Sequence, residues 1–279
     1  TMAFGKLAKR FLFGVLFLIV VIGGMLWPWG FAVLTALLGI ILSIEFYRMT
    51  VDARYLREQV CIIVAVVATA VLGVLHPLLG FDARWMLAGL LPVFVASILL
   101  LFDCAENHEF PVALYFPLVY ILLPLLAAQM LTRPLGGPFT WRLLLGIFVL
   151  MWSNDVGAYC IGMLFGQRPG SRKLFPALSP KKSWIGVVGG TVFSFLAAWI
   201  VSATFGASML SLAHWMVLAL IVSVFGVLGD LFESLIKRHA NVKDAGNLIP
   251  GHGGLLDRFD DVLFVLPLAA IYLKLLLLI

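Results

Sequence analysis

Two apolar stretches near the N-terminus decide the fold: FLFGVLFLIVVIGGMLW at residues 11–27 and WGFAVLTALLGIILSIEFY at residues 29–47. Each is close to the roughly 20 residues that an α-helix needs to cross about 30 Å of hydrocarbon. The turn residues Pro28, Trp29 and Gly30 lie at the junction of the two stretches, so the sequence predicts a tight helical hairpin. Helices are the expected spanning elements, because lipid offers no partner to unsatisfied backbone groups.

The composition of the whole chain repeats the pattern of these two stretches. Of its 279 residues, 63% are hydrophobic and 12% are charged, whereas a soluble domain carries about 25% charged residues. The mean hydropathy is +1.10. These values exclude a water-soluble enzyme and predict an all-α, polytopic membrane bundle. The sequence predicts nine spans, at residues 11–27, 29–47, 59–76, 85–103, 111–131, 141–165, 184–205, 212–236 and 259–279.

The basic residues predict the orientation of this bundle. Most of the 19 lysines and arginines fall in alternate loops on the side that holds the N-terminus, while Arg84, Arg133 and Arg142 fall on the other side. Because basic loops stay in the cytoplasm, we expect a cytoplasmic N-terminus and, with nine spans, an outside C-terminus. The short basic N-terminus favours a bacterial inner membrane. The net charge of +5 suits anionic headgroups or phosphates and does not indicate a nucleic acid.

The chain is predicted to form one transmembrane domain over residues 1–279. The predicted catalytic helices and cytoplasmic loops lie in residues 141–279, whereas residues 1–140 form helices that contain no motif. The three cysteines form no C-x-x-C pair, so neither a disulfide framework nor a zinc site is expected. No glycine-rich phosphate loop is present either, and basic side chains must therefore hold any phosphate.

A first polar cluster lies at the end of the predicted span 141–165 and in the loop after it. Asp155 lies inside the span, and Ser179, Lys181 and Lys182 follow in the loop. An ionised carboxylate within a span costs about 2.5 to 3.5 kcal/mol on insertion scales, so Asp155 should face a cavity or a partner. A structural hydrogen bond to a neighbouring helix remains an alternative. The lysines suit phosphate binding or a lipid-headgroup anchor, and both alternatives stay open.

A second polar cluster reads GDLFESLIKRHANVKDAGNLIPGHGGLLDRFDD at residues 229–261. At its start, steps of three and four residues put one set of side chains on a single face of a helix: Gly226, Asp230, either Glu233 or Ser234, and Lys237. Basic residues and glycines follow, which is typical of a loop that lets ammonium groups and backbone amides approach phosphate oxygens. These residues are Lys237, Arg238, Lys243, Gly246, Gly251, His252, Gly253 and Gly254.

The same cluster ends in three acids, Asp257, Asp260 and Asp261, which we expect in the first turn of the last span. Helix capping alone explains any one of them. Three acids exceed what a cap requires, and with Asp230 they supply hard oxygen ligands that suit Mg²⁺ better than zinc. Carboxylates, cations and glycines in this combination indicate phosphoryl or nucleotidyl transfer, in which catalysis is mainly positioning and charge neutralisation.

This second cluster resembles the signature of the phosphatidate cytidylyltransferase family, also called CDP-diacylglycerol synthases. The matching segments are SLIKR at 234–238, KD at 243–244, PGHGG at 250–254 and DRFD at 257–260. Residues 155–159 and 179–184 are similar to a second motif of that family, from which Ile185 departs. The resemblance implies that CTP and phosphatidate react to CDP-diacylglycerol and pyrophosphate, with Mg²⁺ and, as an option, a second monovalent cation.

The residue pattern and the resemblance together predict the site. The predicted catalytic residues are Asp230, Lys237, Asp257 and Asp260; Asp230 and Asp257 are also the predicted metal ligands, and Asp155 is a secondary candidate. The predicted substrate-binding residues are Ser179, Lys181, Lys182, Ser234, Arg238, Lys243, Asp244, His252, Gly253, Gly254 and Arg258.

The expected partners are CTP, phosphatidate in the cytoplasmic leaflet and the surrounding membrane lipids, with a homodimer left open. Two alternatives have different chemistry. A polyprenol or phytol kinase would transfer the γ-phosphoryl group of CTP and release CDP. A secondary transporter would place carboxylates near the membrane midplane, commonly with an internal repeat; here the acids gather at one face and no repeat is visible.

Overall fold

The computed structural model of this chain describes residues 2–104, 111–248, 253–276 and 279. The chain divides into two compact units, one of Thr1–Gln129 with Ala240–Arg258 and the other of Met130–His239 with Phe259–Ile279. The segment 240–258, which carries most of the signature, therefore belongs to the same unit as the N-terminal helices.

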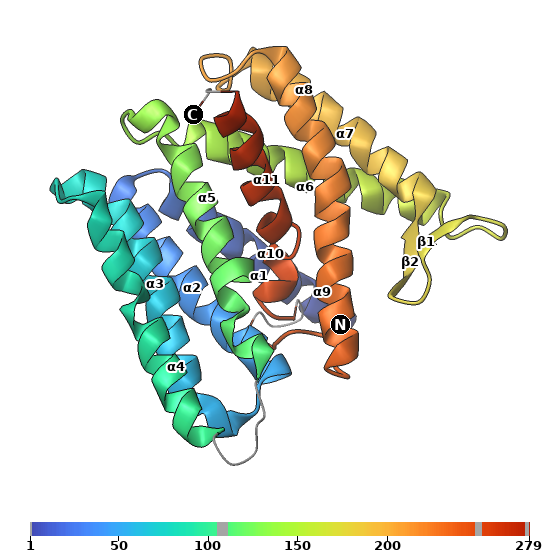
Figure 1. The fold of residues 1–279 in the computed structure, drawn as a ribbon. Helices are drawn as coiled ribbons and strands as arrows, with labels where there is room; N and C mark the ends of the chain where they lie inside the picture. The colour runs from blue at the N-terminus through green and yellow to red at the C-terminus, as the bar shows by residue number, and fades with distance from the viewer. Residues whose placement is uncertain (1, 105–110, 249–252, 277–278) are drawn as a thin grey trace. The chain divides into compact units, whose positions relative to one another are not determined.

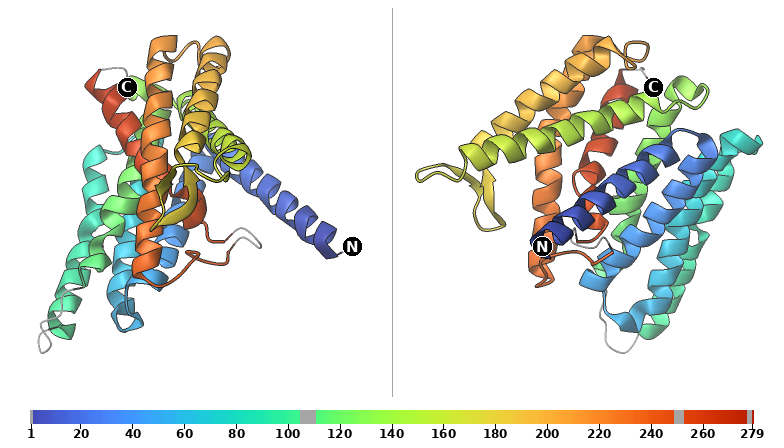
Figure 2. Two further views of the ribbon diagram at one scale, coloured as in Figure 1. Left: turned by 90° about the vertical axis from the view of Figure 1, so that its right-hand side faces the viewer. Right: turned by 180° about the vertical axis from the view of Figure 1, so that it is seen from behind.

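The first unit is built from long apolar helices. They are α1 (Met2–Met25), α2 (Pro28–Thr50), α3 (Leu56–Leu79), α4 (Leu91–Asp103), most of α5 (Leu123–Thr132) and the short turn α10 (Leu256–Phe259). The helices α2, α3 and α4 lie side by side (Figures 1 and 2). Phe46 stacks on Phe116 at 5.5 Å between ring centroids, and the Tyr47 hydroxyl donates a 2.6 Å hydrogen bond to the Leu114 carbonyl. These contacts fix the C-terminal end of α2.

The predicted hairpin of the first two apolar stretches is confirmed. The helix α1 ends at Met25, α2 begins at Pro28, and the two helices pack against each other. Proline suits the first turn of a helix, because the N–H that it lacks would have no intrahelical partner there. The turn consequently lies at Leu26 and Trp27, slightly before the predicted Pro28 to Gly30.

The second unit holds the remaining helices and a small hairpin of strands. Its elements are α6 (Arg142–Leu164), β1 (Lys173–Phe175), β2 (Ser179–Ser183), α7 (Trp184–Ala203), α8 (Leu212–Ile221), α9 (Val227–His239) and α11 (Val262–Leu275). A single π-helical turn, Val222–Gly226, joins α8 to α9, so the predicted span 212–236 is one continuous helix of 28 residues.

Seven helices of the described residues are long and apolar enough to cross a membrane. They match the seven predicted spans from 29–47 to 212–236. The first predicted span corresponds to α1, whose described apolar part is Phe13–Met25. The last corresponds to α11, whose 14 residues give about 21 Å at 1.5 Å per residue. The total of nine spans stays a prediction.

The start of the last span differs from its prediction. Asp257 lies on the separate turn α10, and α11 begins only at Val262. The chain turns at Asp260 and Asp261, and the Asp261 carboxylate accepts a 2.7 Å hydrogen bond from the Val262 N–H. The three acids therefore do not share the first turn of one helix, as the sequence spacing predicts.

The loop between α6 and α7 contains the antiparallel hairpin β1–β2, which an all-α prediction omits. Lys173 pairs with Ser183 and Phe175 pairs with Ser179. The hairpin lies where α6 ends and α7 begins (Figure 2). Strands of three and five residues are too short to show an alternation of apolar and polar side chains in the sequence.

Small residues let α6 and α7 pack closely along their length. A Cβ on Gly157 of α6 would lie 2.6 Å from the Phe193 Cβ, and a Cβ on Gly190 of α7 would lie 2.8 Å from the Asn154 carbonyl oxygen. Close approach through small residues is typical of helix pairs in membranes. The helix pair that carries the hairpin therefore depends on these glycines.

We expect Gly190→Ala to lower the free energy of unfolding by about 1 to 3 kcal/mol, the usual cost of overpacking. The added methyl group would meet the backbone of α6. Thermal unfolding in detergent measures the effect. Gly23→Ala is the matched control, because a Cβ at Gly23 has no neighbour within 4 Å. Equal unfolding midpoints for the two variants would contradict the close packing.

Candidate active site

Four carboxylates of the second unit gather where α6, α9 and the turn before α11 meet. Asp260 lies within electrostatic range of Asp230 on α9 and of Asp261, and Asp261 lies within range of Asp155 on α6. Gly229 makes this approach feasible, since a Cβ there would lie 2.5 Å from the Asp260 carbonyl oxygen. The structure thus brings together acids that lie more than 100 positions apart in the sequence. We call Asp155, Asp230, Asp260 and Asp261 the acid cluster.

The hairpin contributes a cation to the acid cluster. Lys182 Nζ on β2 lies 2.5 Å from Asp230 Oδ2, with 26% of the lysine side chain and 36% of the aspartate side chain exposed. Ser234, one turn along α9, donates a 3.4 Å hydrogen bond to Asp230 Oδ1. Three residues that the sequence assigns to the site thus lie in contact.

The other predicted residues of the hairpin lie differently. Ser179 is half-buried at the strand pairing with Phe175. The Lys181 side chain is exposed, and its carbonyl accepts a 2.9 Å hydrogen bond from Gln167 Nε2. Of the two lysines, Lys182 is therefore the one that the structure places against the acid cluster.

The polar stripe on α9 continues beyond Asp230. Lys237 Nζ donates a 2.8 Å hydrogen bond to Glu233 Oε2, and the Glu233 side chain is fully buried. Lys237 thus gives a buried carboxylate the cationic partner that it needs. Arg238 is exposed near the end of α9. Asp230, Glu233, Ser234 and Lys237 of the predicted stripe all lie on α9, and Glu233 is a buried member that the list of predicted site residues omits.

The signature loop, which we define as residues 240–258 of the first unit, is held by Asp257. Its Oδ2 atom accepts hydrogen bonds from the N–H groups of Ala245, at 2.9 Å, and Gly254, at 2.8 Å. Gly253 adopts φ +86°, and a Cβ there would lie 2.8 Å from the same oxygen. One oxygen of Asp257 therefore has a structural role, and Gly253 and the buried Gly254 shape the loop around it.

Three charged residues of the signature loop have exposed side chains. They are Lys243, Asp244 and Arg258. His252 lies outside the described residues. Asp230 belongs to the second unit and Asp257 to the first, and their pairing as metal ligands stays a prediction.

Glu45, which contacts this loop, is not among the predicted site residues. Glu45 on α2 is 4% exposed, and its carboxylate accepts hydrogen bonds from the backbone N–H groups of Leu255 and Leu256. A signal was present in the sequence, since Glu45 is the one acid in the predicted span 29–47. Ionisable residues inside spans are rare and commonly functional.

The oxygen ligands of the acid cluster have the right chemistry for Mg²⁺. Among the described residues, no group of three or more His, Cys, Asp or Glu side chains forms a ready metal site. This arrangement still fits Mg²⁺, which is usually held by one or two carboxylates together with substrate phosphates and water. Zinc, which takes three or four protein ligands, fits less well.

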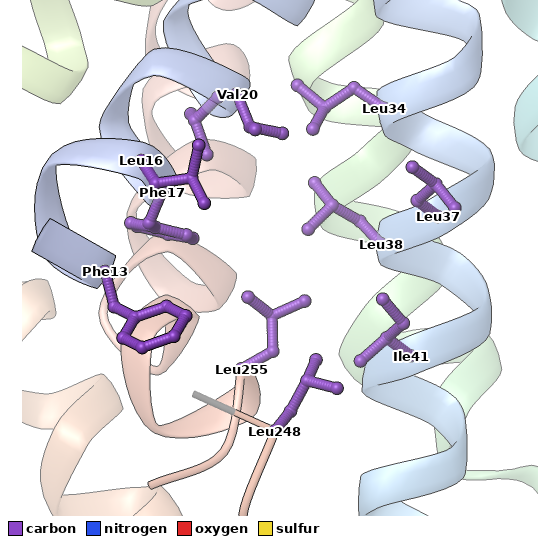
Figure 3. Close-up of a pocket in the computed structure, with 11 residues that line it drawn as sticks. Phe13, Leu16, Phe17, Val20, Leu34, Leu37, Leu38, Ile41, Leu248 and Leu255 are labelled. Carbon is purple, nitrogen blue, oxygen red and sulfur yellow. The ribbon is translucent and has the colours of Figure 1, made fainter. Parts of the chain in front are cut away.

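An apolar cavity lies beside the signature loop (Figure 3). Side chains of α1, such as Phe13, face side chains of α2, such as Leu38 and Ile41, across it. Leu248 and Leu255 of the signature loop close one end. The loop thus presents apolar side chains to the cavity and exposes its charged residues elsewhere.

Comparisons with known proteins identify the family of this chain. Residues 8–276 match the cytidylyltransferase family. A phosphatidate cytidylyltransferase of Staphylococcus saprophyticus is 45% identical over 126 residues, which cover 45% of this chain and 46% of that protein. One of Bacillus subtilis is 46% identical over 119 residues, which cover 43% of this chain and 42% of that protein. The chain thus matches just under half the length of these relatives. Because the family match spans almost the whole sequence, the chain belongs to the cytidylyltransferase family.

Proposed function

We propose that this protein transfers the cytidylyl group of CTP to phosphatidate, which yields CDP-diacylglycerol and pyrophosphate. The contact between Lys182 and Asp230 carries the proposal. It joins the two motifs that resemble the family, and it places a cation among carboxylates, as handling of a metal-bound triphosphate requires. The relatives, which are phosphatidate cytidylyltransferases, support the same substrates.

The reaction needs little covalent chemistry from the protein. An oxygen of the phosphatidate phosphate attacks the α-phosphorus of CTP, the bond from that phosphorus to the bridging oxygen breaks, and pyrophosphate leaves. The attacking phosphomonoester is already ionised near neutral pH, since its second pKa is about 6, so no strong general base is required. Lys182, Lys237, Lys243 and Arg258 are the proposed phosphate contacts, and their charge counters the negative charge of two phosphate-bearing substrates.

Mg²⁺ is the proposed cofactor, with Asp230 and Asp257 as its proposed ligands, and Asp155 and Asp260 are further carboxylates of the acid cluster that contains Asp230. When bound, it would neutralise triphosphate charge and stabilise the leaving pyrophosphate. A second, monovalent cation is an optional part of the same proposal. Ser234 would orient Asp230 through the hydrogen bond between them.

We also propose an orientation of the protein in the membrane. Nine spans, a cytoplasmic N-terminus and an outside C-terminus would put the hairpin and the signature loop on the cytoplasmic side, where CTP is found. Phosphatidate would then enter from the cytoplasmic leaflet of a bacterial inner membrane. The distribution of basic residues and the bacterial origin of the relatives support this orientation. A homodimer is compatible with the proposal.

Product analysis tests the proposed reaction. Purified protein in mixed micelles is incubated with phosphatidate, Mg²⁺ and CTP that is labelled on either the α- or the γ-phosphorus. Cytidylyl transfer puts the α-label into lipid and the γ-label into pyrophosphate. A CTP-dependent kinase would put the γ-label into lipid instead. Absence of label from lipid in both incubations would contradict the proposal, and substrate flux without nucleotide turnover would favour a transporter.

We expect Asp230→Asn to reduce turnover by about 100-fold or more at limiting Mg²⁺, the scale of losing one electrostatic contact in a site. Lys182→Gln should also reduce turnover strongly. The free energy of unfolding should change by at most about 1 kcal/mol, because partly exposed ion pairs contribute little to stability. Kinetics beside thermal unfolding in detergent make the measurement.

Lys181→Gln serves as the comparison for Lys182→Gln, because Lys181 lies on the same strand with an exposed side chain. Its loss of activity should be the smaller. Should Asp230→Asn and Lys182→Gln lose activity only in proportion to lost stability, the pair would be structural. Near-normal rates at limiting Mg²⁺ would remove Asp230 from the proposed metal site.

The proposed orientation predicts the positions of both chain ends. A reporter at the N-terminus should respond as cytoplasmic, and one fused after Ile279 should respond as outside. Activity of reporters specific for each compartment measures this in cells. Cytoplasmic signal from both ends would mean that the number of spans is even.

A further inference from the structure

Glu45 has an unusual position for a charged residue. It lies in the apolar helix α2, between Ile44 and Phe46, and only 4% of it is exposed. A buried carboxylate is costly unless hydrogen bonds satisfy its oxygens. Its retention at this position therefore depends on the groups that it contacts.

Both carboxylate oxygens of Glu45 bind backbone amides of the signature loop. Oε1 accepts a hydrogen bond from the Leu255 N–H at 3.0 Å, and Oε2 accepts one from the Leu256 N–H at 2.7 Å. Leu256 begins the turn α10, where N–H groups have no partner within the helix. One side chain of α2 thus holds two consecutive amides that lie 210 and 211 residues further along the chain.

Two glycines of the loop make room for this carboxylate. A Cβ on Gly246 would lie 2.5 Å from Glu45 Oε1, and a Cβ on Gly254 would lie 2.8 Å from Oε2. Any larger residue would push the loop away from α2. These glycines, which the sequence suggests as part of a phosphate cradle, are explained by the approach of Glu45.

The hydrogen bond from Leu256 to Glu45 fixes the residue that precedes Asp257. Glu45 holds Leu256, while Asp257 itself holds the amides of Ala245 and Gly254. The two carboxylates together fix both sides of the loop, and Arg258 follows directly. Displacement of Leu256 would therefore move Asp257 and Arg258 with it.

We infer that Glu45 is a positioning residue for cytidylyl transfer, which acts through the backbone of the signature loop and does not touch the substrates. The inference rests on the proposed function. It assigns a part in the reaction to an N-terminal helix that contains no recognisable motif. Glutamine at this position would turn an NH₂ group toward a backbone N–H and lose at least one hydrogen bond.

Hydrogen exchange and kinetics of Glu45→Gln test the inference. Peptides that contain Leu255 and Leu256 should exchange at least about 10-fold faster than in the wild type, because their amides lose an acceptor. Turnover should fall by about 100-fold, the scale of a small misplacement of reacting groups. The matched control is Glu58→Gln on α3, which removes another fully buried glutamate of the same unit. It should leave the exchange of these peptides and the turnover unchanged.

The outcomes separate this inference from the proposed function. If the wild type transfers no cytidylyl group, the proposed function fails whatever Glu45 does. If the wild type is active and Glu45→Gln is equally active, the positioning role alone fails, even if the loop exchanges faster. A thermal midpoint lowered in parallel with activity would show a merely structural role.

A second variant covers the case in which Glu45→Gln does not fold. Gly246→Ala keeps Glu45 and crowds its Oε1 atom, so it should loosen the same amides and lower turnover in the same way. Wild-type exchange and turnover in Gly246→Ala would overturn the inference.

Discussion

The hydrogen bonds from the amides of Leu255 and Leu256 to the buried carboxylate of Glu45 organise the first unit. In an apolar bundle a charge must find partners, and backbone N–H groups at the start of a helical turn need acceptors. Each side satisfies the other, and the signature segment is thereby joined to the N-terminal helices. This explains why residues 240–258 belong to the first unit although they lie close to the C-terminus in sequence.

In the second unit, lysine side chains rather than backbone amides compensate the carboxylates. Asp230 pairs with Lys182 from the hairpin, and Glu233 pairs with Lys237 on its own helix. Such pairs compensate carboxylates at the end of an apolar helix while leaving Asp230 partly exposed. A partly exposed, charge-balanced carboxylate can exchange its partner for a ligand, which a fully buried carboxylate cannot do without a large desolvation penalty. The proposed metal binding therefore falls to Asp230, whereas Glu233 holds the Lys237 side chain in place.

The sequence predicts most of the helices because spans in lipid must be long and apolar, a property that hydropathy reads directly. It also predicts the polar side of α9, since helical spacing fixes which residues share a face. The hairpin β1–β2 escapes prediction because it depends on pairing between two short strands. The position of Asp257 on a separate turn could not be predicted for a similar reason. Its hydrogen bonds to the amides of Ala245 and Gly254 form only when the loop folds. Glu45 was visible as a lone acid in a span, but its partners lie 210 residues away.

The central claim is that carboxylates such as Asp230, together with lysines, hold a metal-bound triphosphate, and equilibrium binding of CTP to the purified protein tests it most directly. Dialysis with labelled CTP, in the absence of phosphatidate, measures binding without turnover. The account predicts binding that requires Mg²⁺ and is weakened strongly in Asp230→Asn, while the variant remains folded. CTP binding that is equally tight without Mg²⁺, or equally tight in Asp230→Asn, would contradict the account.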